Sequence, residues 1–169
     1  MEIQYAPLLP KKQEKRLFAG LLLLSVALIA ASLIPSVWAP HLMRALAAIS
    51  LFTSAMIYSR CLMRRYVYRV ELCTADEWGT SYDFTVTEYT GARGTVVCRL
   101  AVSNVESAVR LTAENRRSQL ADTRGCSVYT YTGTLFPTEE YLLKAWDGEK
   151  PVYLKILASE LLINRLLTP

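Results

Sequence analysis

Residues 17 to 63 form an almost unbroken apolar stretch, and no other feature limits what this chain can fold into so strongly. The run from Leu17 to Trp38 contains 22 residues and no charged side chain. A helix rises about 1.5 Å per residue, so this run would reach about 33 Å and cross the roughly 30 Å hydrocarbon core of a bilayer. The sequence therefore predicts a membrane-spanning helix over residues 17–38.

A second apolar run covers residues 42–63. Its two arginines, Arg44 and Arg60, lie near its ends, where long side chains can reach the headgroups. Residues 39–41 leave room only for a tight turn between the two runs. The stretch 17–63 is therefore predicted to form a transmembrane helical hairpin.

Two other interpretations of this stretch are a cleaved signal peptide and a pair of buried helices in a soluble protein. The apolar region of a signal peptide normally spans about 7–15 residues, and here a second span follows at once. A remaining domain of about 100 residues, in turn, is too small to cover both helices. Both interpretations are disfavoured.

Basic side chains border the apolar stretch on the sides where the chain enters and leaves it. Because cytoplasmic flanks of membrane helices are rich in Lys and Arg, both termini are predicted to be cytoplasmic. Residues 1–16 then form a cytoplasmic N-terminal segment and residues 64–169 a cytoplasmic domain. The flanking basic residues are Lys11, Lys12, Lys15, Arg16, Arg60, Arg64, Arg65 and Arg69.

The net charge of +4 is unevenly divided. Eight basic and two acidic side chains precede residue 66, whereas eleven basic and thirteen acidic ones follow it. The C-terminal domain is thus slightly acidic, and nucleic-acid binding loses its electrostatic support.

The two spans carry little that a transport pathway needs. No Asp, Glu or Lys lies within them, so the hairpin is predicted to be an anchor rather than a channel or proton relay. Small residues recur four apart, at Ala27 and Ala31 and at Ser50 and Ser54. This spacing permits either packing within the hairpin or a dimerisation face.

The sequence offers no catalytic or metal-binding constellation. Its four cysteines form no CxxC pair and its one histidine, His41, lies between the spans, so no zinc site and no cofactor are expected. Ser-His-Asp and Cys-His schemes lack a base, and glycine-rich phosphate loops are absent. The cysteines are predicted to be free thiols, with a disulfide between strands as the alternative, and the chain is predicted not to be an enzyme.

After residue 66 the apolar pattern changes to a period of two, which is typical of strands. Alternation is clear around residues 66–72, 82–86 and 105–111, and a glycine turn at 91–94 separates the second strand from a return at 95–100. Further strands are expected at 126–132, 141–146 and 152–156, whereas residues 114–125 fit no strand. The run SELLINRLL from Ser159 then predicts an amphipathic helix with a serine N-cap.

About seven antiparallel strands and a terminal capping helix predict a mostly-β domain with some α structure, built as a bent sheet or partly open barrel. This order is that of the pleckstrin-homology-like (PH-like) fold. The stretch DFTVTEYTGARGTVVCRLAVSNVESAV resembles strands two to four of bacterial PH-like domains. Together with MEIQY and the two spans, it resembles the YcxB-like family of bacterial membrane proteins. The resemblance implies a fold and a topology but no reaction.

Two groups of arginines are the candidate contact residues. One group follows the second span, where each side chain near an anionic surface contributes about 1 kcal/mol. The other lies in the 114–125 segment and is either a solvated loop cluster or a contact for headgroups or an acidic partner. The headgroup candidates are Arg64, Arg65 and Arg69; the loop candidates are Arg116, Arg117 and Arg124.

These features, together with the resemblance, predict a non-catalytic, membrane-tethered PH-like interaction or scaffold module of a bacterial inner membrane. The expected partners are the lipid bilayer and a protein partner or a second copy of the chain. The alternatives are a small accessory subunit of a transporter or cell-envelope complex, and an enzyme completed by a partner chain.

Overall fold

The computed structural model describes residues 3–7, 11–34, 39–76 and 79–167. The chain forms two compact units. The helical unit comprises Leu9–Arg64 and Gly133–Leu135, and the strand unit comprises Met1–Leu8, Arg65–Thr132 and Phe136–Pro169.

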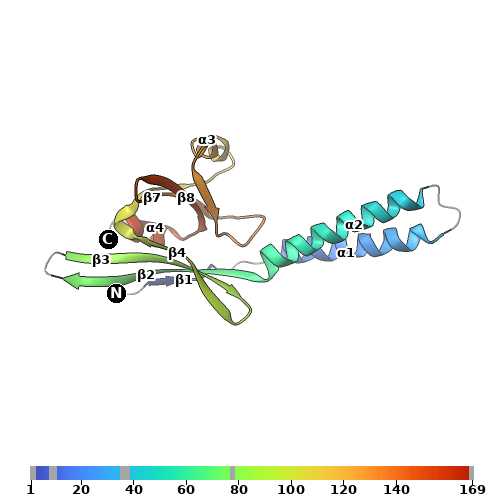
Figure 1. Cartoon of the computed structure of the whole chain (residues 1–169), viewed down its shortest axis with the longest axis horizontal. Helices are drawn as coiled ribbons and strands as arrows, with labels where there is room; N and C mark the ends of the chain where they lie inside the picture. Colours follow the sequence, from blue (N-terminus) through green and yellow to red (C-terminus); the bar gives the residue numbers. More distant parts are fainter. Residues whose placement is uncertain (1–2, 8–10, 35–38, 77–78, 168–169) are drawn as a thin grey trace. The chain divides into compact units, whose positions relative to one another are not determined.

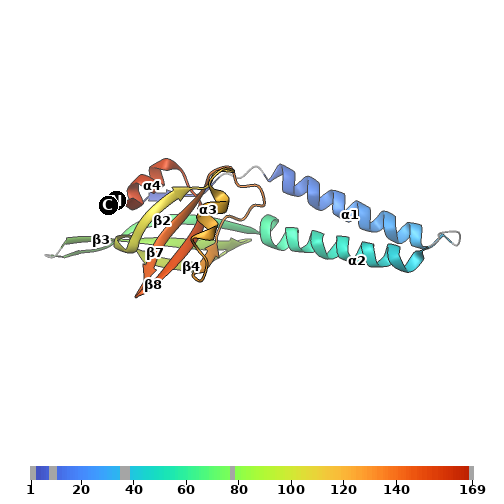
Figure 2. The same cartoon turned by 90° about the horizontal axis from the view of Figure 1, so that it is seen from above.

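The helical unit contains two long helices that lie side by side (Figures 1 and 2), α1 (Lys12–Ser32) and α2 (Pro40–Ile57). A π-helical turn, η1 (Tyr58–Leu62), continues α2. Both helices are long and apolar enough to cross a membrane. Pro40 is the first residue of α2. Proline has no backbone N–H, and the first turn of a helix requires none as a hydrogen-bond donor.

The helix bounds differ from the prediction. Helix α1 begins at Lys12, five residues before Leu17. Lys and Glu have helix propensities similar to that of Leu, so the helix extends into this charged segment. It ends at Ser32, and residues 35–38 of the predicted span lie outside the described residues. The second helix begins two residues before Leu42, at the proline.

The first sheet of the strand unit has the order β1-β2-β3-β4. Its strands are β1 (Ile3–Tyr5), β2 (Arg64–Asp76), β3 (Gly79–Thr90) and β4 (Arg93–Ala101). Strands β3 and β4 form a hairpin through Gly91, whose φ of 66° suits glycine. Strand β1 was not predicted: these residues, expected in the N-terminal segment, pair antiparallel with Tyr68–Val70.

The second sheet has the order β5-β7-β8-β6. Its strands are β5 (Val105–Arg110), β6 (Ser127–Thr130), β7 (Glu140–Asp147) and β8 (Lys150–Leu157). Strand β6 runs parallel to β8, so the expectation of antiparallel strands throughout was wrong. The long connection from Tyr131 to Glu139 carries the chain on to β7, so β6 does not form a hairpin with the next strand. The segment before β6 contains a short helix, α3 (Arg116–Ala121).

The core of the strand unit is covered by the C-terminal helix α4 (Glu160–Leu167). The backbone N–H of Leu162 donates to Ser159 Oγ at 3.4 Å, as the predicted N-cap requires. Helix α4 buries Leu162, Ile163 and Leu166 in the core and leaves Leu161 exposed. Two apolar helices followed by strand-rich sheets and a terminal helix confirm the coarse architecture that the sequence predicts.

Candidate functional site

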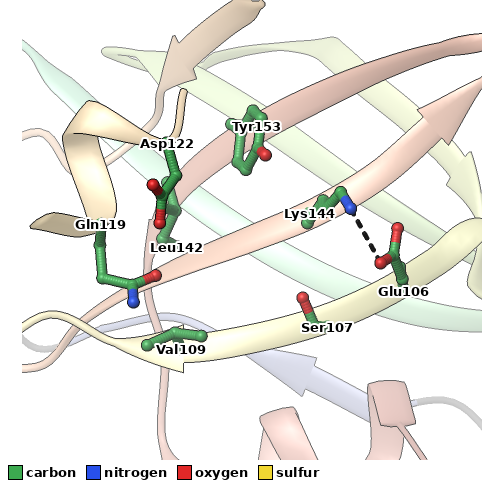
Figure 3. Close-up of a pocket in the computed structure, with 8 residues that line it drawn as sticks. All are labelled: Glu106, Ser107, Val109, Gln119, Asp122, Leu142, Lys144 and Tyr153. Carbon is green, nitrogen blue, oxygen red and sulfur yellow. Dashed lines mark hydrogen bonds and ion pairs between the residues drawn. The ribbon is translucent and has the colours of Figure 1, made fainter. Parts of the chain in front are cut away.

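A polar pocket lies on the outer face of the second sheet (Figure 3). Alternation along β7 places Tyr141 and Leu143 in the core and turns Leu142 and Lys144 to the opposite face. Helix α3 contributes Gln119 to the pocket wall. The volume is about 280 Å³, and the lining residues are Glu106, Ser107, Val109, Gln119, Asp122, Leu142, Lys144 and Tyr153.

A bulge in β5 places Glu106 at the edge of this pocket. Val105 is paired with Ala145 and Ser107 with Lys144, which leaves Glu106 as the extra residue between them. In a regular strand, neighbouring residues point to opposite faces. Here both Glu106 and Ser107 line the pocket, so the bulge brings the carboxylate to the face that carries Lys144.

Glu106 is the acceptor for two donors from β7. Lys144 Nζ donates to Glu106 Oε1 at 2.8 Å, and Trp146 Nε1 donates to Oε2 at 2.9 Å. The ammonium group also lies 5.6 Å from the Trp146 ring centroid. The hydrogen bond from Lys144 lowers the pKa of the Glu106 carboxyl, and the same bond raises the pKa of Lys144.

Helix α3 is held over the sheet by an ion pair that the sequence did not predict. Arg116 Nη2 donates to Glu140 Oε2 at 2.7 Å, and the Glu140 side chain is 4% exposed. Asn115 supports the turn before α3, because its Oδ1 accepts from the Thr112 N–H and its Nδ2 donates to the Arg110 carbonyl, both at 2.8 Å. These bonds connect α3, which contributes Gln119 to the pocket wall, to the strands of the second sheet and to the turn after β5.

The pocket combines charged and neutral polar groups. The hydrogen bond between Glu106 and Lys144 lowers the pKa of the carboxyl and raises the pKa of the ammonium group, which favours the charged form of both. Ser107, Gln119 and Tyr153 add neutral hydrogen-bonding groups beside the apolar Leu142. The pocket thus fits a small polar group or a side chain of a partner.

The structure separates the three predicted headgroup candidates. Arg64 and Arg65 are exposed at the start of β2. Arg69 is only partly exposed and pairs with Glu71, with Nη1 and Oε1 at 3.6 Å. Arg69 is therefore a weaker candidate than the other two.

The three loop candidates also differ. Arg116 forms an ion pair with Glu140 and stays about half exposed, whereas the expectation of a solvated Glu140 was wrong, because this side chain is buried. Arg117 and Arg124 are exposed, and neither forms an ion pair with a residue that the structure describes. None of the six arginines lines the pocket.

Sequence reasoning missed the pocket. Alternation from Val105 to Leu111 predicts which residues of β5 share a face, but it assigns Glu106 and Ser107 to opposite faces. No sequence signal marks the bulge, because it depends on the partner strand. No protein-family model, curated protein or solved structure matches this chain.

Proposed function

We propose that this chain is a non-catalytic, membrane-tethered PH-like interaction module of the YcxB-like type in a bacterial inner membrane. Its hairpin spans the membrane with both termini in the cytoplasm. The strand unit then presents its polar pocket to a protein partner that is held in or near the same membrane. Tethering raises the effective concentration of two proteins confined to one surface.

The observation that carries this proposal is that the helical unit exposes large apolar side chains and buries polar ones. Large apolar side chains lie on its surface: Leu23 is 68% exposed, Phe52 69% and Ile49 63%. Its buried positions include four serines, Ser25, Ser32, Ser50 and Ser54. Such a surface is costly in water and favourable in lipid. A membrane anchor accounts for it and leaves molecular recognition to the strand unit.

The exposed arginines after the second helix support the orientation. Arg64 and Arg65 follow η1 after one intervening residue, Met63, and each contributes about 1 kcal/mol when it lies near an anionic leaflet. A double substitution of Arg64 and Arg65 to Gln is expected to weaken association of the full chain with anionic vesicles. The single substitution Arg69→Gln is the matched control, because that arginine pairs with Glu71.

Site-specific photocrosslinking in native membranes tests the interaction proposal. A photoreactive residue at Ser107 lies in the pocket, and one at the exposed Ser103 lies outside it and serves as the control. We expect a discrete adduct from position 107 that position 103 does not form, identified by mass spectrometry. Recovery of the chain only as a monomer or homodimer from both positions contradicts a partner-binding module.

A further inference from the structure

The loop residues Gly133–Leu135 belong to the helical unit although they lie far along the chain from its helices. Thr134 Oγ1 donates a hydrogen bond to Glu14 Oε1 in the first turn of α1. Glu14 is 3% exposed, so this carboxylate is buried rather than solvated. This hydrogen bond places the loop beside the first turn of α1.

A second set of contacts marks the same end of the hairpin. Lys11 Nζ donates to the backbone carbonyls of Cys61 and Arg64, the latter at 2.8 Å. A lysine at the C-terminal end of a helix satisfies its last carbonyls and interacts favourably with its dipole. The N-terminal end of α1, the C-terminal end of η1 and the loop at Thr134 therefore form one polar layer.

The depth of this layer follows from helix geometry. Glu14 precedes the first apolar residue of α1, Leu17, by three residues, which is about 4.5 Å along the helix axis. The polar region on each side of a bilayer core is about 5–7 Å thick. Leu135 is the neighbour of Thr134, one Cα step of about 3.8 Å away. Its side chain is 48% exposed. When α1 spans a membrane, Leu135 thus lies within reach of the headgroup layer.

We propose that Leu135 inserts into the interfacial layer of the cytoplasmic leaflet and forms a third membrane contact beside the two helices. This inference rests on the proposed membrane-spanning hairpin. The occupant is lipid, because the exposed apolar residues of α1 begin at Leu17, three residues after the Glu14 that Thr134 contacts, and Leu135 is the exposed apolar neighbour of Thr134. An apolar side chain beside basic residues suits this layer, where acyl chains and anionic headgroups meet. The basic residues at this end are Lys11, Lys12, Lys15 and Arg16.

A fluorescence experiment on the full chain in anionic liposomes tests this contact. An environment-sensitive fluorophore is attached to a single cysteine introduced by Leu135→Cys, Leu23→Cys or Val128→Cys, with the four native cysteines replaced by alanine. Leu23 is exposed on α1 and Val128 is exposed on β6. We expect the emission of the label at 135 to be shifted to the blue by an amount between the shifts at 23 and 128. A quencher attached to lipid at shallow depth is expected to reduce the fluorescence of the label at 135.

The outcomes separate this inference from the function on which it rests. If the label at 23 reports lipid while the label at 135 reports water, as the label at 128 does, the Leu135 contact alone is overturned. Labels that report water at both 23 and 135 overturn the membrane-spanning hairpin as well.

The hydrogen bond to Glu14 provides a matched pair of variants. In the Leu135→Cys background, Thr134→Val removes the hydroxyl with little change of shape and is expected to reduce the blue shift. Thr134→Ser keeps the hydroxyl and is expected to retain it. Equal shifts in the two variants would contradict positioning by this bond.

A photoactivatable lipid added to the unsubstituted chain gives an independent test. We expect lipid adducts on residues 133–136, and their absence would contradict the proposal.

Discussion

The helical unit and the strand unit bury opposite kinds of side chain. The strand unit encloses large apolar groups such as Tyr68, Phe84 and Leu154. The helical unit instead encloses serines and exposes leucines, and Ser50 Oγ donates to the Leu21 carbonyl across the two helices at 2.7 Å. This difference is the one expected if the helical unit lies in lipid, as proposed, and the strand unit in water. Water drives apolar groups inward, whereas in lipid close packing and hydrogen bonds hold helices together.

The comparison also identifies where binding is expected. Between its charged ends the helical unit exposes mainly apolar side chains, and no Asp, Glu or Lys lies in residues 17–63. The outside of the strand unit combines charges, hydroxyls and an amide in one pocket. Specific recognition needs a few well-placed polar groups, and the pocket of the strand unit brings such groups together.

The largest expected effect compares the same substitution in the two units. Leu154→Ala removes a buried side chain from the strand core and is expected to lower the free energy of unfolding by about 2–5 kcal/mol. Leu23→Ala, on the exposed face of α1, is expected to change it little, because lipid or detergent fills the space. Urea unfolding of the full chain in micelles, followed by circular dichroism, measures both; equal losses would break the comparison.

A smaller effect is expected where the strand unit buries a charge. Arg116→Ala leaves the Glu140 carboxylate without its ion-pair partner. We expect a loss of about 2 kcal/mol, below the roughly 3–5 kcal/mol typical of fully buried pairs because Arg116 is half exposed. Arg117→Ala, the adjacent exposed arginine, is the control in the same unfolding experiment. Similar stability of the two variants would mean that the pair does not hold α3.

The serine contacts of the helical unit provide the next test. Ser54 is 2% exposed and its hydroxyl donates to the Leu51 carbonyl at 2.8 Å. Ser54→Leu overfills the space between the helices and is expected to cost about 1–3 kcal/mol. Thr53→Leu adds the same side chain on the exposed face and is expected to be neutral. Titration with a denaturing detergent measures helix unfolding, and a neutral Ser54→Leu would contradict close helix packing.

The smallest effect concerns chemistry within the strand unit. Burial raises the pKa of the Cys98 thiol to about 11, whereas Cys73 is exposed. At pH 8 only about one in a thousand Cys98 thiols is then the reactive thiolate. Alkylation of Cys98 is expected to be slow and to rise about tenfold per pH unit until the pH approaches 11. Mass spectrometry of alkylated peptides compares the two cysteines; equal rates at pH 8 would contradict a raised pKa of the partly buried Cys98.

Sequence patterns predicted the elements whose signal is local. The uncharged run after Leu17 indicated a long helix, and alternation along β2, β3 and β5 indicated strands. Ser159 with the following leucines indicated α4 and its cap. Each of these depends on neighbours within a few residues, and each is present in the structure.

Other elements depend on partners far along the chain. Strand β1 is three residues long and exists through pairing with β2. The parallel pairing of β6 with β8 depends on the path of two connections, which local patterns do not encode. The same holds for the bulge at Glu106 and for the burial of Glu140 beneath α3.

The sequence by itself therefore determined that the chain has an apolar hairpin followed by a strand-rich unit, because solvation and local periodicity act residue by residue. Only the tertiary structure decided which polar groups meet. It paired Arg116 with Glu140 and brought Glu106 to Lys144, and it placed Thr134 against Glu14. These contacts join residues 24, 38 and 120 positions apart, and such distances are closed only when the sheets and helices pack.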